Sequence, residues 1–214
     1  MSTSPALAAA AATRHGDVWP DTFQARLQVL TQLQQLNADL LARHSATATL
    51  QHWCEVHGVA AGFRIAARRV ADQDHAAGPA EREALGVGPD APLRFRRVRL
   101  VCGDRVLSVA DNWYRPDRLS AEMNRALDDT ETPFGEVARS LDYRRRTLSA
   151  ELLFRPLPTD WETAPRPAEV AGARLEIPEN VMRHRAVLST PDGAAISLVT
   201  ETYTDQVLFR PTGV

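Results

Sequence analysis

The sequence predicts an α+β fold built around an antiparallel sheet. Segments with helical periodicity come in neighbouring pairs, and strand-like segments come as hairpins. No regular alternation of strand and helix runs along the 214 residues. The length and the 44% hydrophobic content suffice for one domain with a core of its own. We expect residues 1–20 to form a flexible alanine-rich tail and residues 21–214 to form a single domain.

The first pair of helices follows from apolar spacing and capping residues. Residues 22–43 carry leucines at helical intervals, and either Ser45 or Thr47 can cap a second helix that ends at Gly58. The stripe of leucines is short and lacks flanking charges, so it indicates a core rather than a zipper. The second pair is expected in residues 116–127 and, after the break at residues 132–135, in a short helix that ends at Leu141.

Two hairpins form the centre of the expected sheet. Residues 93–102 and 105–114 are β-forming runs separated by Gly103-Asp104, a spacing typical of a tight antiparallel turn. Residues 182–189 and 194–204 flank a second turn at Pro191-Asp192-Gly193. Further strands are expected in residues 63–70 and 145–154, a short helix in residues 80–85, and a long surface loop in residues 156–178.

Composition excludes several classes of function. The formal net charge of -2 argues against nucleic acid as a partner, and no apolar run is long enough to cross a membrane. All 25 basic residues are arginine, so lysine-based Schiff-base chemistry, pyridoxal phosphate attachment and a phosphate-loop lysine are excluded. Cys54 and Cys102 are expected to be reduced thiols in a cytoplasmic protein. We expect no metal, because His52 and His57 are badly spaced to share an ion.

The most informative position is an acid within an apolar, β-forming run. Glu201 alternates with Val199 and Tyr203, so the pattern turns it toward the core, where a carboxylate needs a cation or a donor. Arg97 falls on the same face as Phe95 and is the expected partner. The two side chains form either a structural ion pair or the polar end of a pocket for a small anionic ligand.

Other arginines offer weaker candidates. Arg183 and Arg185 share a face of their strand, and either one could look into the same cavity as Glu201. The run of residues 144–146 reads as a solvated strand end with a possible anion contact.

Four stretches, taken in order, resemble the chorismate lyase family (chorismate–pyruvate lyases), and the likeness spans residues 36–209. They are Leu40-Leu41 with residues 45–50; residues 97–102 followed by Pro116; residues 132–136; and residues 183–185 leading to residues 198–203.

The resemblance implies a sheet covered by two helix–turn–helix flaps that close over a buried ligand. By this resemblance, Glu201 and Arg97 are the catalytic residues. The residues of the flap turns that contact the ligand are Ala46, with Thr47 beside it, and Phe134, with Gly135 beside it. Arg185 is added as a substrate-binding residue. Phe134 stands where the family often has leucine, Ala46 where it often has a larger residue, and the loop at residues 156–178 has no clear counterpart.

The activity implied by the resemblance is removal of pyruvate from chorismate to give 4-hydroxybenzoate, without a cofactor. Arginine suits the grip on carboxylates, and an acid in an apolar pocket suits the proton transfer. The alternatives are a non-catalytic module of the same fold that binds a small aromatic carboxylate, and an unrelated protein in which Arg97 and Glu201 form a salt bridge. We expect a cytoplasmic monomer.

Overall fold

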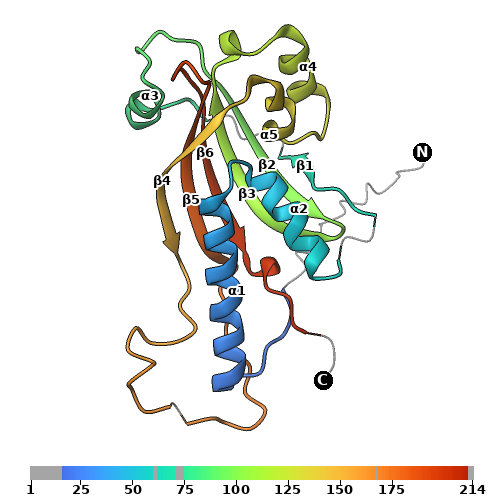
Figure 1. The fold of residues 1–214 in the computed structure, drawn as a ribbon, viewed down its shortest axis with the longest axis vertical. Helices are drawn as coiled ribbons and strands as arrows, with labels where there is room; N and C mark the ends of the chain where they lie inside the picture. The colour runs from blue at the N-terminus through green and yellow to red at the C-terminus, as the bar shows by residue number, and fades with distance from the viewer. Residues whose placement is uncertain (1–15, 60–61, 71–74, 167, 212–214) are drawn as a thin grey trace, which may run out of the picture.

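In the computed structural model, which describes residues 16–59, 62–70, 75–166 and 168–211, six strands form one antiparallel sheet. The strands lie in the order β1-β2-β3-β6-β5-β4, so the two long hairpins occupy the centre (Figure 1). This is the α+β architecture expected from the sequence. The strand bounds are Ala66–Arg69 (β1), Arg94–Cys102 (β2), Arg105–Tyr114 (β3), Arg144–Leu152 (β4), Asn180–Ser189 (β5) and Ala195–Thr204 (β6).

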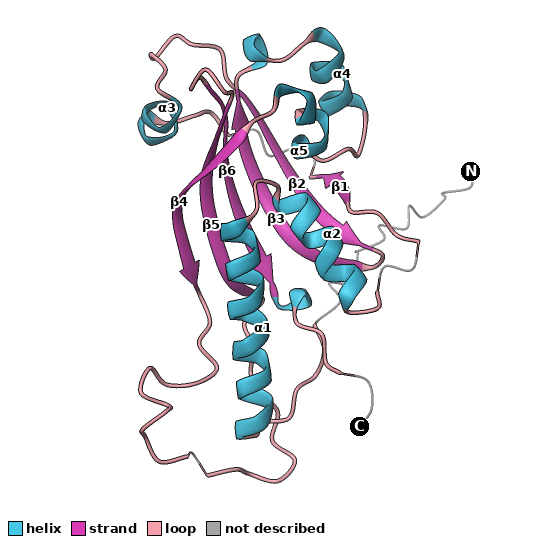
Figure 2. Cartoon of the chain, in the orientation of Figure 1, coloured by secondary structure: helices cyan, strands magenta, loops and turns pink. Residues whose placement is uncertain are grey.

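The helices gather on one face of the sheet and around one of its ends (Figure 2). Helices α1 and α2 lie across the front of the sheet, whereas α4 and α5 cluster near the end of β2 and β3. Their bounds are Phe23–Ala42 (α1), Ala46–Val56 (α2), Pro79–Leu85 (α3), Ala121–Asp129 (α4) and Phe134–Val137 (α5), with 3₁₀ turns at Pro116–Arg118, Arg139–Leu141 and Asp205–Val207.

The main core lies between α1, α2 and the sheet. The leucine stripe of α1 is buried, including Leu33, Leu36 and Leu40, and it packs on the apolar faces of β3, β5 and β6. Thr22 caps α1 by accepting a hydrogen bond from the amide of Ala25, and Ser45 caps α2 by accepting one from Ala48. Because α2 follows α1 after three residues, its first turn is held at the edge of this core.

The last residues of the expected tail, residues 16–20, pack against the rest of the chain. Trp19 is buried at 1% exposure, and its carbonyl accepts a hydrogen bond from the amide of Leu175. The amide of Gly16 donates to Asp205. Residues 16–20 therefore belong to the packed domain, and the rest of the expected tail, residues 1–15, lies outside the described residues.

Helix α3 covers part of the opposite face of the sheet. Leu85 packs there against Val187 and Leu198, with Trp113 at the margin. The sheet therefore has apolar residues on both faces near its upper end. For this reason the strands do not show a clean alternation of apolar and polar residues.

Two expected elements differ from those observed. The helix expected in residues 116–127 is a 3₁₀ turn followed by α4, because Ser120 takes an extended conformation and caps α4 through the amide of Met123. The strand expected in residues 145–154 is β4, which begins at Arg144 and ends at Leu152. Residues 153–166 and 168–179 run as loop below α1 (Figure 1).

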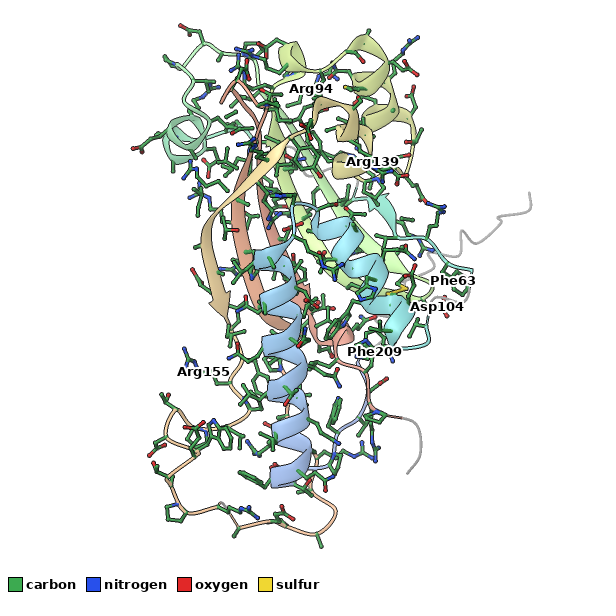
Figure 3. The ribbon with its side chains drawn as sticks, in the orientation of Figure 1. Phe63, Arg94, Asp104, Arg139, Arg155 and Phe209 are labelled. Carbon is green, nitrogen blue, oxygen red and sulfur yellow. A yellow bond between two sulfur atoms is a disulfide. The ribbon has the colours of Figure 1, made fainter. Side chains whose placement is uncertain are left out.

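The expectation of reduced cysteines is wrong in this structure. Cys54 of α2 and Cys102 of β2 form a disulfide across 48 residues, and both side chains are fully buried (Figure 3). The large separation along the chain hid the pairing, because a disulfide depends on the fold rather than on spacing. The bond ties α2 directly to the sheet.

We predict that reduction lowers the stability of the folded chain. Cross-linking residues 48 apart removes conformational freedom from the unfolded chain, so its loss should cost about 2–4 kcal/mol. The measurement is urea denaturation with and without a reducing agent. A Cys54→Ser/Cys102→Ser variant is the control, and it should not respond to the reductant. Equal stability of the parent chain in both conditions would contradict the disulfide.

Candidate functional site

A pocket of about 530 Å³, including the part open to solvent, lies between the sheet and the two flap turns. Its floor is made by inward-facing residues of β2, β3, β5 and β6. Its rim is made by the turn that begins α2 and by the turn that begins α5. The lining residues are His44, Ser45, Ala46, Thr47, Arg96, Val98, Leu100, Ala110, Asn112, Pro133, Phe134, Gly135, Tyr143, Arg145, Leu188 and Val199.

The two flap turns touch each other at the rim. The hydroxyl of Tyr143 donates to the carbonyl of Gly135 at 3.4 Å. A β-carbon on Gly135 would lie 2.7 Å from that hydroxyl and 3.6 Å from the hydroxyl of Ser45. A side chain at position 135 would therefore displace the hydroxyl of Tyr143, whereas it would meet Ser45 of the other turn at ordinary van der Waals distance. Burial raises the pKa of Tyr143, so this hydroxyl stays protonated and able to donate.

A buried ion pair lies behind the pocket. Arg145 of β4 donates from Nη2 to Oε2 of Glu201 on β6 at 2.7 Å, and their side chains are 4% and 6% exposed. Tyr203 also donates to this carboxylate, at 3.2 Å. Burial lowers the pKa of Arg145, but the charge of Glu201 and the neighbouring tyrosines outweigh it, so the net shift is upward. Arg145 thus remains a cation, and it also lines the pocket.

A second arginine lines the pocket without an acidic partner. Arg96 of β2 is 3% exposed, and its two terminal nitrogens donate to the carbonyls of Thr132 and Thr130 at 3.3 and 3.2 Å. Within the described segments it makes no salt bridge, and its Nε–H is buried without a hydrogen-bond partner. Burial and the nearby charge of Arg69 lower the pKa of Arg96.

The expected pair of Arg97 and Glu201 does not form. Arg97 faces the opposite side of the sheet, where it pairs with Asp111 through both prongs of its guanidinium. The reason is that regular alternation along β2 turns Arg96, Val98 and Leu100 to the inner face of the sheet. Arg97 therefore lies with Phe95 on the outer face, where the ring of Phe95 packs against Trp113.

Arg185 also lies away from the pocket. It approaches Glu81 of α3 at 3.8 Å, on the same side of the sheet as Arg97. The neighbouring His184 is the residue of β5 that points inward, and it stands directly opposite Glu201. The expectation that Arg183 or Arg185 shares a cavity with Glu201 is therefore wrong.

The structure brings four of the seven expected site residues to the pocket wall: Ala46, Thr47, Phe134 and Gly135. Glu201 turns inward as expected and lies behind Arg145. Sequence reasoning missed Arg96, Asn112 and Arg145. The expectation for residues 144–146, a solvated strand end with a possible anion contact, fits Arg144 and Arg146, which are exposed. Alternation along the strand turns Arg145 to the opposite face, where it meets Glu201.

His184 completes the buried polar group. Its Nε2 lies 2.8 Å from Oδ1 of Asn37 on α1, and its Nδ1 has no hydrogen-bond partner in the described part of the chain. Its ring meets Tyr203 edge-on. Burial lowers the pKa of His184 to about 4, with Glu201 opposing and Arg145 adding to the shift. The imidazole is therefore neutral at ordinary pH.

Comparison with known proteins identifies a relative over most of the chain. It is 46% identical over 195 residues to the Sinorhizobium fredii (strain NBRC 101917 / NGR234) protein named "Uncharacterized protein y4mC", covering 90% of this chain and 82% of the relative. The chain belongs to the y4mC family. No protein-family model matches it.

Several solved structures of bacterial proteins overlap with this y4mC-family chain. The effector domain of PhnF from Mycobacterium smegmatis is 19% identical, with a TM-score of 0.48 over 75% of this chain and 88% of that one. A structure of PhnF from the same organism is 18% identical, with a TM-score of 0.49 over 95% and 93% of the two chains. The ligand-binding domain of a GntR-family regulator from Bordetella bronchiseptica is 12% identical, with a TM-score of 0.43 over 71% and 90%.

The expected chorismate lyase activity is corrected by these findings. The structures named above include an effector domain and the ligand-binding domain of a regulator. The arginine assigned to catalysis, Arg97, lies across the sheet from Glu201, which is already neutralised by Arg145. The assignment of lyase activity, with chorismate as substrate and 4-hydroxybenzoate as product, is therefore wrong. None of the described helices is long and apolar enough to cross a membrane.

We predict that the two arginine–carboxylate pairs differ strongly in their effect on stability. Arg145→Gln strands a buried carboxylate and should lower the free energy of unfolding by about 3–5 kcal/mol. Arg97→Gln breaks a partly exposed pair and should cost about 1 kcal/mol or less. Urea denaturation of both variants measures the difference. An apolar double variant, Arg145→Met/Glu201→Leu, should recover much of the loss. Equal losses in the two single variants would contradict the assignment of the buried pair.

We also predict a loss of stability in acid that depends on His184. The unfolded chain takes up a proton on this imidazole below about pH 6.5, whereas the folded chain takes it up only near pH 4. The free energy of unfolding should therefore fall as pH drops through this window, by an amount on the order of 3 kcal/mol from this residue.

The test compares parent and His184→Gln in urea between pH 4 and pH 7.5. Glutamine can still donate to Asn37 but does not titrate, so the variant should show a flatter pH profile even if it is less stable throughout. Parallel profiles for the two proteins would rule out the assigned contribution.

Proposed function

We propose that this chain is a small-molecule-binding module whose ligand sits in the pocket under the two flap turns. The observation that carries the proposal is the pocket itself. It lies between the sheet and the two flap turns, and its floor is largely apolar, with Val98, Leu100 and Val199. A few polar side chains, among them Arg96, Asn112 and Arg145, also line the pocket, and such groups can orient a ligand.

The described geometry favours binding over catalysis. The inward-facing acid, Glu201, is held by Arg145 and Tyr203 and is not among the residues that line the pocket. His184 is neutral and hydrogen-bonded to Asn37, also behind the pocket wall. Neither group is placed to exchange a proton with a ligand, whereas the flap turns are placed to enclose one.

The experiment fills the pocket and asks whether ligand-induced stabilisation disappears. Ala110 of β3 lines the floor, so Ala110→Phe should occupy the space a ligand needs. The parent is screened by thermal shift against a library of small metabolites that spans neutral, cationic, monoanionic and dianionic compounds. We expect at least one compound to raise Tm of the parent and none to raise Tm of Ala110→Phe.

The matched control is Val109→Phe, which adds the same bulk one residue away on the opposite face of the sheet. It should keep the response of the parent. The proposal fails if no compound of any charge stabilises the parent, or if Ala110→Phe responds as the parent does.

A further inference from the structure

The charges around the pocket leave one cation unbalanced. Arg145 is neutralised by Glu201. The terminal nitrogens of Arg96 donate only to backbone carbonyls, which do not neutralise its charge. Among the described residues, no acid lines the pocket. Outside the wall, Asp128 is exposed and paired with Arg94 at 2.9 Å, so it does not neutralise Arg96 directly. The pocket wall therefore carries a net charge of one positive unit.

Unused donors accompany this charge. The Nε–H groups of Arg96 and Arg145 are both buried and lack hydrogen-bond partners in the described structure. Asn112 also lines the pocket, and its amide oxygen already accepts from Ser197, which leaves its amide N–H groups for a ligand. A buried donor without an acceptor is costly, so the two guanidinium Nε–H groups at one pocket indicate an acceptor with several lone pairs.

We infer that the ligand is a monocarboxylate with a compact apolar body, whose carboxylate is bound at Arg96, Asn112 and Arg145. This inference rests on the proposed binding function and names its ligand class. One carboxylate supplies one negative charge and two acceptor oxygens, which match the single uncompensated cation and the unused N–H groups. The apolar body would lie against Val98, Leu100 and the ring of Phe134.

The same charge count disfavours other anions. A phosphate ester carries about 1.5 to 2 negative charges near neutral pH, and a dicarboxylate carries two. Either would leave excess negative charge in a site whose second arginine is already paired with Glu201. A neutral amide would leave Arg96 uncompensated, which is the unfavourable state of the empty pocket.

The empty pocket should therefore be a source of instability. A buried cation without an anion costs free energy of folding, and sites kept for binding often carry such a cost. Arg96→Gln removes the charge, and glutamine can still donate to the carbonyl of Thr130 or Thr132. Unliganded Arg96→Gln should have Tm equal to or above that of the parent, a result that a purely structural role for Arg96 would not give.

The test uses three monocarboxylates: benzoate, phenylacetate and cyclohexanecarboxylate. Each is compared with its own primary amide and with a dicarboxylate on the same ring, by thermal shift and calorimetry on the parent chain. We expect at least one monocarboxylate to bind about 10-fold or more tightly than both of its analogues. In Arg96→Gln this preference should fall to about one, and in Arg97→Gln, the matched control on the opposite face, it should be unchanged.

Three results would contradict binding of a monocarboxylate at Arg96. The inference is overturned if no monocarboxylate binds the parent, if an amide or dicarboxylate binds as tightly, or if Arg96→Gln keeps the preference. The broader library separates this failure from failure of the binding function. Stabilisation by neutral, cationic or dianionic compounds alone overturns only the ligand class, whereas stabilisation by none overturns the binding module as well.

Discussion

The pocket depends on one ion pair that spans three strands. Arg145 lies on edge strand β4 and Glu201 on β6, with β5 between them. The long arginine side chain reaches across β5, and the pair ties the edge of the sheet to its centre on the inner face. Because both charges are buried, neither can be removed singly without stranding the other. This constraint fixes the back wall of the pocket and leaves Arg96 as its uncompensated charge.

Local sequence patterns were sufficient to predict most of the helices and strands. The leucine spacing of α1, the cap at Ser45 and the two hairpin turns are short-range signals, and they appear where the sequence places them. The segment after Pro116 was harder, because Ser120 interrupts what looks like continuous helical spacing. Strand faces were harder still. Strand β2 carries apolar residues on both faces, with Val98 and Leu100 inward and Phe95 outward, so the pattern alone does not show that Arg96 rather than Arg97 faces the core.

The candidate site could be predicted only in part, for a physical reason. The flap residues Ala46 and Phe134 belong to turns whose positions follow from local breaks in helical pattern. The partner of Glu201 could not be predicted from such local signals, because Arg145 is 56 residues away along the chain and has an arginine on each side of it. Composition alone cannot say which of 25 arginines reaches a given acid. The link between Cys54 and Cys102 is hidden in the same way.

The edges of the sheet have a consequence for how the chain behaves in a crowded solution. Strand β1 has only four residues, of which Arg68 and Arg69 are exposed, and β4 exposes Arg144, Arg146 and Glu151 along its length. Short, charged edges are poor templates for pairing with another chain, because added strands would bring like charges together and bury them. The sheet thereby resists growth into larger aggregates at both of its open sides.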